Sequence, residues 1–305
     1  MNKIYIKARA KINLSLEVLN KRNDNYHNIK SVFQKINLYD EIYIEKIDTN
    51  KIELETNINT LNNEENTIYK AYKKLKEEYK NISGVKVILK KNIPIQAGLG
   101  GGSADCASFI LGMIKLFNLK LNKEELETLG RKLGADVVPC FYNTAVLAEG
   151  IGDRITPINT SFKYFIVIVK PSIYCNTKKM YELIDNRNKL NTREPSNIIV
   201  EGLENNDINL IANNLYNDFE DVQIENDLIQ DIKKELLKNG AIGASMTGSG
   251  SCVYGIFKNK EIAQKAYKKL SYNYQAYICT SYNSKRRYNL GWWKESYSNY
   301  TGCRK

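Results

Sequence analysis

A glycine-rich segment between Pro94 and Asp105 carries the clearest chemical signal in the sequence. It reads PIQAGLGGGSAD, and glycine fills four of five consecutive positions near its middle. It follows an alternating strand pattern at 85–89 and precedes an apolar helical pattern at 103–117. Such a loop at a helix N-terminus can hold phosphate on free backbone N–H groups, and we expect positive φ angles within it, including at Gly101. A flexible turn is the alternative, and the segment is neither a Walker A loop nor a G-x-G-x-x-G motif.

Three other positions combine polar side chains with turns or helix starts. Asp136 lies in the segment LGADVVP, where it is a candidate general base, although a helix N-cap is the common reason for an aspartate after Gly134. Asn66 precedes a helical pattern, so it either caps that helix or reaches a ligand. A second glycine-rich turn at 247–250 precedes a strand pattern, which a tight turn also explains.

Lys11 and Asn13 share the polar face of an alternating strand at 12–18. An outward lysine on a half-buried strand explains Lys11 as well as a functional role does. The neighbouring pair Tyr26 and His27 suits a nucleobase, because one ring can stack on the base while the imidazole bonds to its edge. His27 is the only histidine, which excludes a multi-histidine zinc site and an H-E-x-x-H protease helix.

Composition and charge narrow the class of protein further. The chain has 305 residues and six scattered cysteines without a C-x-x-C pair, and it shows no secretion signal and no run of 18 apolar residues. We therefore predict a cytoplasmic protein with reduced thiols, without a membrane partner and without assigned metal ligands; a four-cysteine metal site is the open alternative. The formal net charge is +11, of which the segment 284–305 carries +5. Such charge favours anionic ligands, although a lysine-rich composition explains much of it.

The order of expected elements predicts an α+β protein of two domains and a tail. We expect a domain at 1–158, a second at 159–283 with a split βαβ pattern, and a basic tail at 284–305 that is an appendage. Helices are expected near 178–186, 206–216 and 225–239 in the second half, and a capping box at Asn122 opens a helix that Gly134 ends.

Six segments together resemble the GHMP kinase superfamily of small-molecule kinases over residues 5–280. The Pro-x-x-x-Gly-Leu-Gly segment from Pro94 is similar to its second motif, and its triple glycine is similar to one branch. The other matching segments are AKINL at 10–14, NYH at 25–27 with Asn for the usual Gly, LGADVVP at 133–139 with one extra valine, NDFE at 217–220 and MTGSGSC at 246–252. The resemblance implies an N-terminal domain like ribosomal protein S5 domain 2 and a ferredoxin-like C-terminal domain.

The resemblance also implies a reaction and a set of site residues. It implies transfer of phosphate from ATP, with Mg²⁺ arriving on ATP, to a cytidine diphosphate-linked sugar alcohol. Asp136 would be the base, and Lys11 would lie beside it and the acceptor hydroxyl. The expected ATP-binding residues are Pro94, Gly98, Leu99, Gly100, Gly101, Gly102, Ser103, Ala104 and Asn66. The expected substrate-binding residues are Asn13, Tyr26, His27, Tyr181 as a second ring on the base, Thr247 and Gly248.

Two rival functions remain open. The first is another kinase of the same superfamily, of the homoserine or mevalonate type, against which the Tyr26-His27 pair and the triple glycine argue. The second is a basic nucleic-acid-binding protein without catalysis, which the charge and the tail favour. We expect no nucleic-acid partner, and the sequence does not indicate an oligomeric state.

Overall fold

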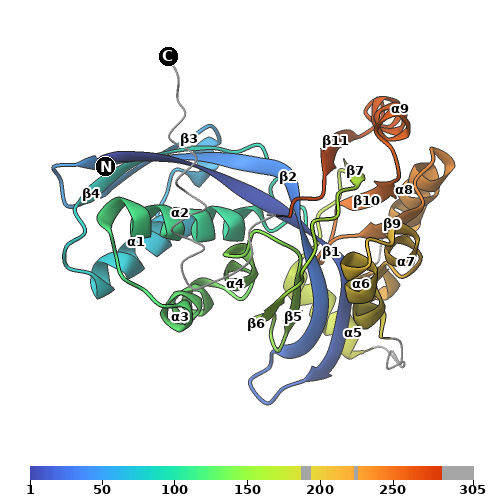
Figure 1. Ribbon diagram of the computed structural model, residues 1–305, viewed down its shortest axis with the longest axis horizontal. Helices are drawn as coiled ribbons and strands as arrows, with labels where there is room; N and C mark the ends of the chain where they lie inside the picture. Colours follow the sequence, from blue (N-terminus) through green and yellow to red (C-terminus); the bar gives the residue numbers. More distant parts are fainter. Residues whose placement is uncertain (187–193, 223–225, 284–305) are drawn as a thin grey trace.

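The computed structural model describes residues 1–186, 194–222 and 226–283 and contains two β-sheets with helices around them (Figure 1). The first sheet has the strand order β3-β4-β2-β1-β8, and β5 pairs with β2 and β6. The second has the order β11-β7-β10-β9 and is antiparallel. The predicted α+β class is confirmed. The predicted tail at 284–305 lies outside the described residues.

The first sheet is built on two long antiparallel strands, β1 (Lys3–Lys21) and β2 (His27–Ile47). The shorter strands are β3 (Ile52–Thr56), β4 (Gly84–Lys90), β5 (Val146–Glu149) and β6 (Arg154–Pro157). The register of β1 on β2 shifts between Arg9 and Lys11 and again between Asn13 and Ser15. Such irregularities bend a strand and re-aim its side chains, and these two flank the predicted site residues of β1.

Helices α1 (Thr67–Glu78), α2 (Gly101–Phe117), α3 (Lys123–Leu133) and α4 (Val137–Cys140) lie on one side of this sheet (Figure 1). A short 3₁₀ turn, η1 (Asn59–Leu61), precedes α1. Helix α2 is apolar nearly all round, as expected for a helix enclosed by a sheet and other helices. The expected capping box at Asn122 and the helix end at Gly134 are confirmed.

The second sheet contains β7 (Phe165–Lys170), β9 (Gly243–Met246), β10 (Val253–Phe257) and β11 (Gln275–Thr280). Helices α8 (Asn226–Lys238) and α9 (Lys260–Leu270) cover one face through an apolar cluster that includes Val167 and Phe257. The opposite face packs against β1 and β2, since Ile166, Tyr254 and Ile12 belong to one buried cluster. A hydrophobic core therefore joins the two sheets.

The segments between β7 and β9 hold α5 (Thr177–Asp185), α6 (Pro195–Glu204), α7 (Ile208–Asn213), β8 (Tyr216–Asn217) and the 3₁₀ turn η2 (Asp218–Val222). The sequence patterns did not predict α6 or β9, and the helix expected at 206–216 is shorter. Strand β8 pairs in parallel with β1, at Ser15 and Leu16. The second half thus contributes a strand to the first sheet, and the boundary at 158/159 stays a prediction.

The last described residues also dock on the first half of the chain. Ser281 forms a bridge with Ile36 of β2. The Asn283 side chain is buried, and its Oδ1 accepts hydrogen bonds from the backbone N of Ala145 at 3.0 Å and from Gln34 at 3.1 Å. Its Nδ2 donates to the carbonyl oxygen of Phe162 at 2.9 Å. Asn283 therefore belongs to the folded unit and not to the appendage.

We expect a chain ending at Asn283 to unfold at higher urea concentration than one ending at Tyr282. Removal of Asn283 leaves the buried Ala145 N–H without its partner, which costs about 1–3 kcal/mol. The free energies of unfolding of the two truncated chains, measured in urea, test this. Equal values would show that the buried amide contributes nothing.

Because the resemblance ends near residue 280, we also expect the chain that ends at Asn283 to retain kcat/KM within a few-fold of the full chain.

Candidate active site

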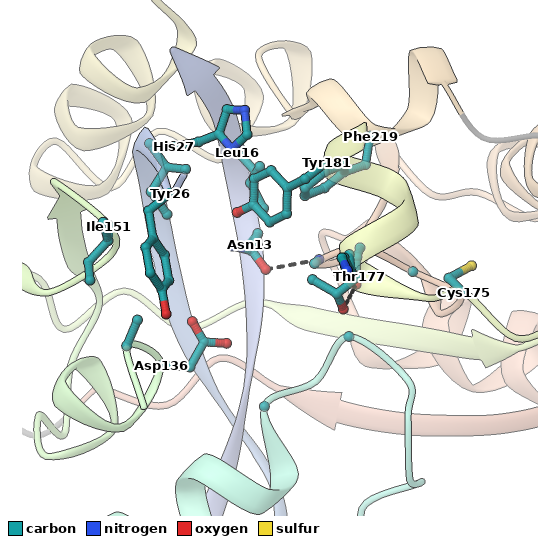
Figure 2. A pocket seen from close by; sticks show the side chains of 18 of the residues that line it. Asn13, Leu16, Tyr26, His27, Asp136, Ile151, Cys175, Thr177, Tyr181 and Phe219 are labelled. Carbon is teal, nitrogen blue, oxygen red and sulfur yellow. Dashed lines mark hydrogen bonds between the residues drawn. The ribbon is translucent and has the colours of Figure 1, made fainter. Parts of the chain in front are cut away.

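A cavity of about 710 Å³ opens between the two halves of the molecule. Its walls come from β1, the start of β2, the glycine-rich loop, the turn before α4, the helix α5 and the turn at 248–250. Figure 2 shows Asp136, Tyr26 and Tyr181 around this space with Asn13 between them. Residues more than 200 positions apart in the sequence thus line one site.

The pair Lys11 and Asp136 lies on the wall of the cavity. The Lys11 side chain is 6% exposed, and its ammonium donates to Asn13 Oδ1 at 2.8 Å and lies 3.7 Å from Asp136 Oδ2. Asp136 occupies the N-cap position of α4, yet its side chain makes no capping hydrogen bond and is 45% exposed. The arrangement disfavours the two purely structural explanations, in which Lys11 points outward and Asp136 caps a helix.

The two glycine-rich turns pack directly on each other. Gly98 has φ of +74°, and a Cβ atom built on it would lie 2.0 Å from the carbonyl oxygen of Thr247. A Cβ on Gly248 would lie 3.0 Å from the Cα of Gly98. The Thr247 hydroxyl donates to the Gly98 carbonyl oxygen at 3.2 Å. Glycine is therefore required at 98 and 248 for the close approach of two backbones.

The glycine loop presents only some of its predicted residues to the cavity. Gly98, Gly100 and Ser103 line it, and Gly100 has φ of +65° and lies against the Lys11 side chain. Among the other predicted ATP-binding residues, Leu99 and Ala104 are buried in the core, and the lining does not include Pro94, Gly101 or Gly102.

The expectation of positive φ at Gly101 was wrong. Helix α2 already begins at this residue, two positions earlier than expected, so the positive φ values stop at Gly100. A Cβ on Gly101 would meet Ile93 and the Lys91 ammonium, and not the cavity.

Asn13 connects the catalytic pair with the second turn. Its Oδ1 accepts from Lys11 and from the Gly248 backbone N at 3.0 Å, and it lies 3.3 Å from the Thr247 hydroxyl, whose one proton it shares with the Gly98 carbonyl oxygen. Its Nδ2 donates to Ser31 Oγ at 2.9 Å, and its backbone N donates to the Thr247 hydroxyl. Asn13 borders the cavity, whereas Thr247 is fully buried and outside the lining. Both side chains hold the site together.

The aromatic residues predicted for a nucleobase meet at the far end of the cavity. Tyr26 is 60% exposed, whereas His27 is buried, with its ring stacked on Tyr181 at a centroid distance of 4.9 Å. Burial raises the pKa of Tyr181 to about 12. All three side chains line the cavity, and His27 covers one face of the Tyr181 ring (Figure 2).

Sequence reasoning missed Asp185, which lies on α5 in the lining of the cavity. Its Oδ1 lies 2.6 Å from His27 Nε2, and its Oδ2 accepts from Lys21 at 2.6 Å. The hydrogen bond from Lys21, followed by that from His27, lowers the pKa of the Asp185 carboxyl. The available signal was the spacing of four from Tyr181, which places both side chains on one helix face.

Asn66 has a structural position outside the cavity lining. Its Oδ1 accepts from the backbone N of Ile68 at 3.0 Å and its Nδ2 donates to the Leu61 carbonyl oxygen at 3.0 Å. The Asn66 side chain therefore caps the N-terminus of α1. The next residue, Thr67, donates to the Gly102 carbonyl oxygen at 2.8 Å and connects α1 with the glycine loop.

Within residues 1–186, 194–222 and 226–283, no group of three or more His, Cys, Asp and Glu side chains is arranged to hold a metal ion. No helix in the same ranges is long and apolar enough to span a membrane.

Comparison with known proteins identifies the class of this fold and site. Residues 66–144 match the GHMP kinases N terminal domain, and residues 199–276 match the GHMP kinases C terminal domain. A homoserine kinase from Cytophaga hutchinsonii shares the fold with a TM-score of 0.73 at 22% identity, over 92% of this chain and 95% of that one. The glycine loop, the two domain matches and the shared fold define a GHMP kinase, an ATP-dependent phosphotransferase.

Similar proteins point to one branch. The chain is 38% identical to the 4-diphosphocytidyl-2-C-methyl-D-erythritol kinase of Clostridioides difficile, over 92% of this chain and 96% of that protein. It is 41% identical to the kinase of the same name from Caldicellulosiruptor saccharolyticus, over 91% and 96%. The crystal structure of a 4-(cytidine 5'-diphospho)-2C-methyl-D-erythritol kinase superimposes with a TM-score of 0.80 at 27% identity, covering 92% of this chain and all of that one. The chain belongs to the 4-diphosphocytidyl-2-C-methyl-D-erythritol kinase family.

Proposed function

We propose that this enzyme transfers the γ-phosphate of ATP to the 2-hydroxyl of 4-diphosphocytidyl-2-C-methyl-D-erythritol, a step of the non-mevalonate isoprenoid pathway. The observation that supports this best is the Lys11–Asp136 pair on a wall shared by the glycine loop and the aromatic end of the cavity. An acceptor bound by its base at the aromatic end would extend its alcohol toward this pair. We also propose a cytoplasmic location, which rests on the scattered cysteines of the sequence.

The phosphates of ATP would lie against the glycine loop. The loop turns its backbone toward the cavity at Gly98 and Gly100, and α2 begins at once after it. The positive end of that helix dipole favours an anion at this place. Ser103 adds a hydroxyl in the first turn of the helix.

Mg²⁺ would reach the site bound to ATP. Mg²⁺ in such sites keeps phosphate and water oxygens as its main ligands. The Ser103 hydroxyl, which lines the cavity from the first turn of α2, would be an oxygen group of this chain beside such a cation. Bound there, Mg²⁺ would supply neutralising charge to the transferring phosphate.

Asp136 and Lys11 would have separate roles at the acceptor hydroxyl. The half-exposed Asp136 carboxylate accepts the hydroxyl proton as the oxygen attacks phosphorus. The Lys11 ammonium stabilises the developing negative charge on that oxygen. Asn13 fixes the ammonium through its 2.8 Å hydrogen bond, so the cation does not have to reorganise during the reaction.

The cytosine base would bind near Tyr26 and His27. The exposed Tyr26 ring has a free surface for stacking, and His27 is held by Asp185 on one nitrogen and by Tyr181 on its face. A fixed imidazole presents its other nitrogen in one orientation, which suits recognition of a base edge. Tyr181 would then support His27 in addition to contacting the base.

We expect Asp185→Asn to raise KM for the cytidine substrate by roughly 10-fold, the scale of one lost positioning contact, and to leave KM for ATP unchanged. The change weakens the bond that orients His27 Nε2. Asp231→Asn is the control, because it removes an exposed carboxylate on α8 that pairs with Lys234, and it should leave both KM values unchanged. Steady-state kinetics with each substrate varied in turn measure both constants. A parallel rise in the two KM values would contradict this role.

The function itself is tested by ADP release from the full chain with four candidate acceptors. These are 4-diphosphocytidyl-2-C-methyl-D-erythritol, its uridine analogue, mevalonate and homoserine. We expect turnover with the cytidine compound and little with the others. Preference for mevalonate or homoserine would assign another kinase of the superfamily. Salt-sensitive RNA binding without ADP release would favour the nucleic-acid alternative.

A further inference from the structure

A buried cluster of charged side chains lies behind the glycine loop. Lys91 follows the end of β4, and its ammonium forms ion pairs with Asp40 of β2 and with Asp105 of α2, the latter at 2.6 Å. The three side chains are 5%, 0% and 4% exposed. None of them lines the cavity of about 710 Å³, so the mechanism above makes no use of them.

Asp40 holds the segment that leads into the loop. Its Oδ2 pairs with Lys91, while its Oδ1 accepts from the backbone N of Asn92 at 2.5 Å and of Ile93 at 2.8 Å. These are the residues just before Pro94. The carboxylate thus fixes the backbone at the point where the chain leaves β4 and turns toward the glycines.

Lys91 holds the other end of the loop through Asp105. Asp105 lies one turn inside α2, and the Lys91 ammonium lies 3.4 Å from where a Cβ on Gly101 would be. The lysine therefore lies directly behind the first residue of the helix. A single ammonium group connects the entry of the loop with its exit.

The buried charges of this cluster add little to the stability of the fold, which favours a role in positioning the backbone. A buried ion pair contributes little net stability, because desolvation of the charges offsets their attraction. Asp105 Oδ1 has no hydrogen-bond partner, and burial, with the nearby Asp40 carboxylate as a further cause, raises the pKa of Asp105 well above its usual range. Apolar residues of similar volume would fill this space without such a cost.

We infer that Lys91 is a positioning residue for ATP, which sets the loop amides at 98–101 through its bonds to Asp40 and Asp105. The inference rests on the proposed role of the glycine loop. Lys91 does not touch the nucleotide. It fixes both ends of the segment on which the phosphates rest, and a displacement of about 1 Å in such a segment is enough to lower catalysis by as much as 100-fold.

The test compares two adjacent lysines. Lys91→Met removes the buried ammonium, whereas Lys90→Met removes its exposed neighbour, which forms a surface pair with Glu41 at 3.3 Å. We expect Lys91→Met to weaken ATP binding by roughly 10- to 100-fold, with binding of the cytidine substrate within about 2-fold of wild type. Lys90→Met should bind both as wild type does. Calorimetric titration of each full-length variant with each ligand gives the four dissociation constants.

A second pair of variants covers the case in which Lys91→Met does not fold. Asp105→Asn keeps an oxygen that accepts from Lys91, so we expect ATP affinity within about 3-fold of wild type, whereas Asp105→Ala should weaken it by roughly 10-fold. Equal ATP affinities in the two Asp105 variants, or an equal loss of both ligands in Lys91→Met, would overturn the inference. If wild-type protein binds no ATP, the proposed function fails instead.

Discussion

Replacement of Asp136 by asparagine is expected to lower kcat by roughly 10²- to 10⁴-fold, the usual range for a lost general base. Asparagine keeps the shape of the side chain and removes its capacity to take a proton. Because the carboxylate makes no capping bond to α4, the fold should be unaffected. The dissociation constant of ATP should change little, because the nucleotide rests on the glycine loop. Single-turnover kinetics at saturating substrate measure the chemical step directly.

Asp231→Asn is the control for this substitution. Asp231 is an exposed carboxylate on α8 that forms a surface pair with Lys234, so its loss should leave kcat unchanged. If Asp136→Asn retains near-normal turnover, proton removal does not require this carboxylate, and the assigned mechanism is wrong.

Gly98→Ala is expected to weaken ATP binding by roughly 100-fold, on the scale of a 1 Å displacement of the phosphate site. The new methyl group would lie 2.0 Å from the Thr247 carbonyl oxygen, so the two glycine turns must separate. The φ of +74° adds strain of about 1–2 kcal/mol for any residue with a side chain. Titration calorimetry measures the affinity, and circular dichroism checks that the variant is folded.

The same loop supplies the control for Gly98→Ala. A Cβ on Gly102 would meet only the Thr67 side chain, at an ordinary distance of 3.8 Å, and Gly102 lies in the first turn of α2 without a positive φ. We therefore expect Gly102→Ala to bind ATP within a few-fold of wild type. If both alanine variants bind ATP equally well, the contact between the two turns does not shape the phosphate site.

Local sequence patterns predicted the features that depend on neighbouring residues. The strand at 85–89, the helix that follows the glycine run and the capping box at Asn122 all appear where their residue types favour them. Each depends on hydrogen bonds or hydrophobic periodicity within about ten residues. The family resemblance then supplied Lys11 and Asp136 as a pair, which their spacing alone does not indicate.

Long-range partners account for what the sequence did not predict. The spacing of four from Tyr181 places Asp185 on the same helix face, but it does not show that this face packs beside His27, 158 positions earlier. The alternating pattern places Asn13 on the polar face of its strand, and it does not show that the turn at 247–250 buries this amide. Strand β8 is two residues long and carries no periodicity, so its pairing with β1 follows only from the tertiary fold.

The bonds of β1 have a consequence for the order in which a ribosome delivers the chain. The Asn13 backbone N–H finds its partner in Thr247, which is 234 residues later, and that of Val18 finds it in Asp218, which is 200 residues later. At a synthesis rate of about 5–20 residues per second, these two N–H groups are made roughly 10–50 s before their partners. The nascent chain can pair β1 with β2 early, yet it cannot assemble the phosphate site until most of its length has emerged. The active site is therefore among the last parts of the molecule to form during synthesis.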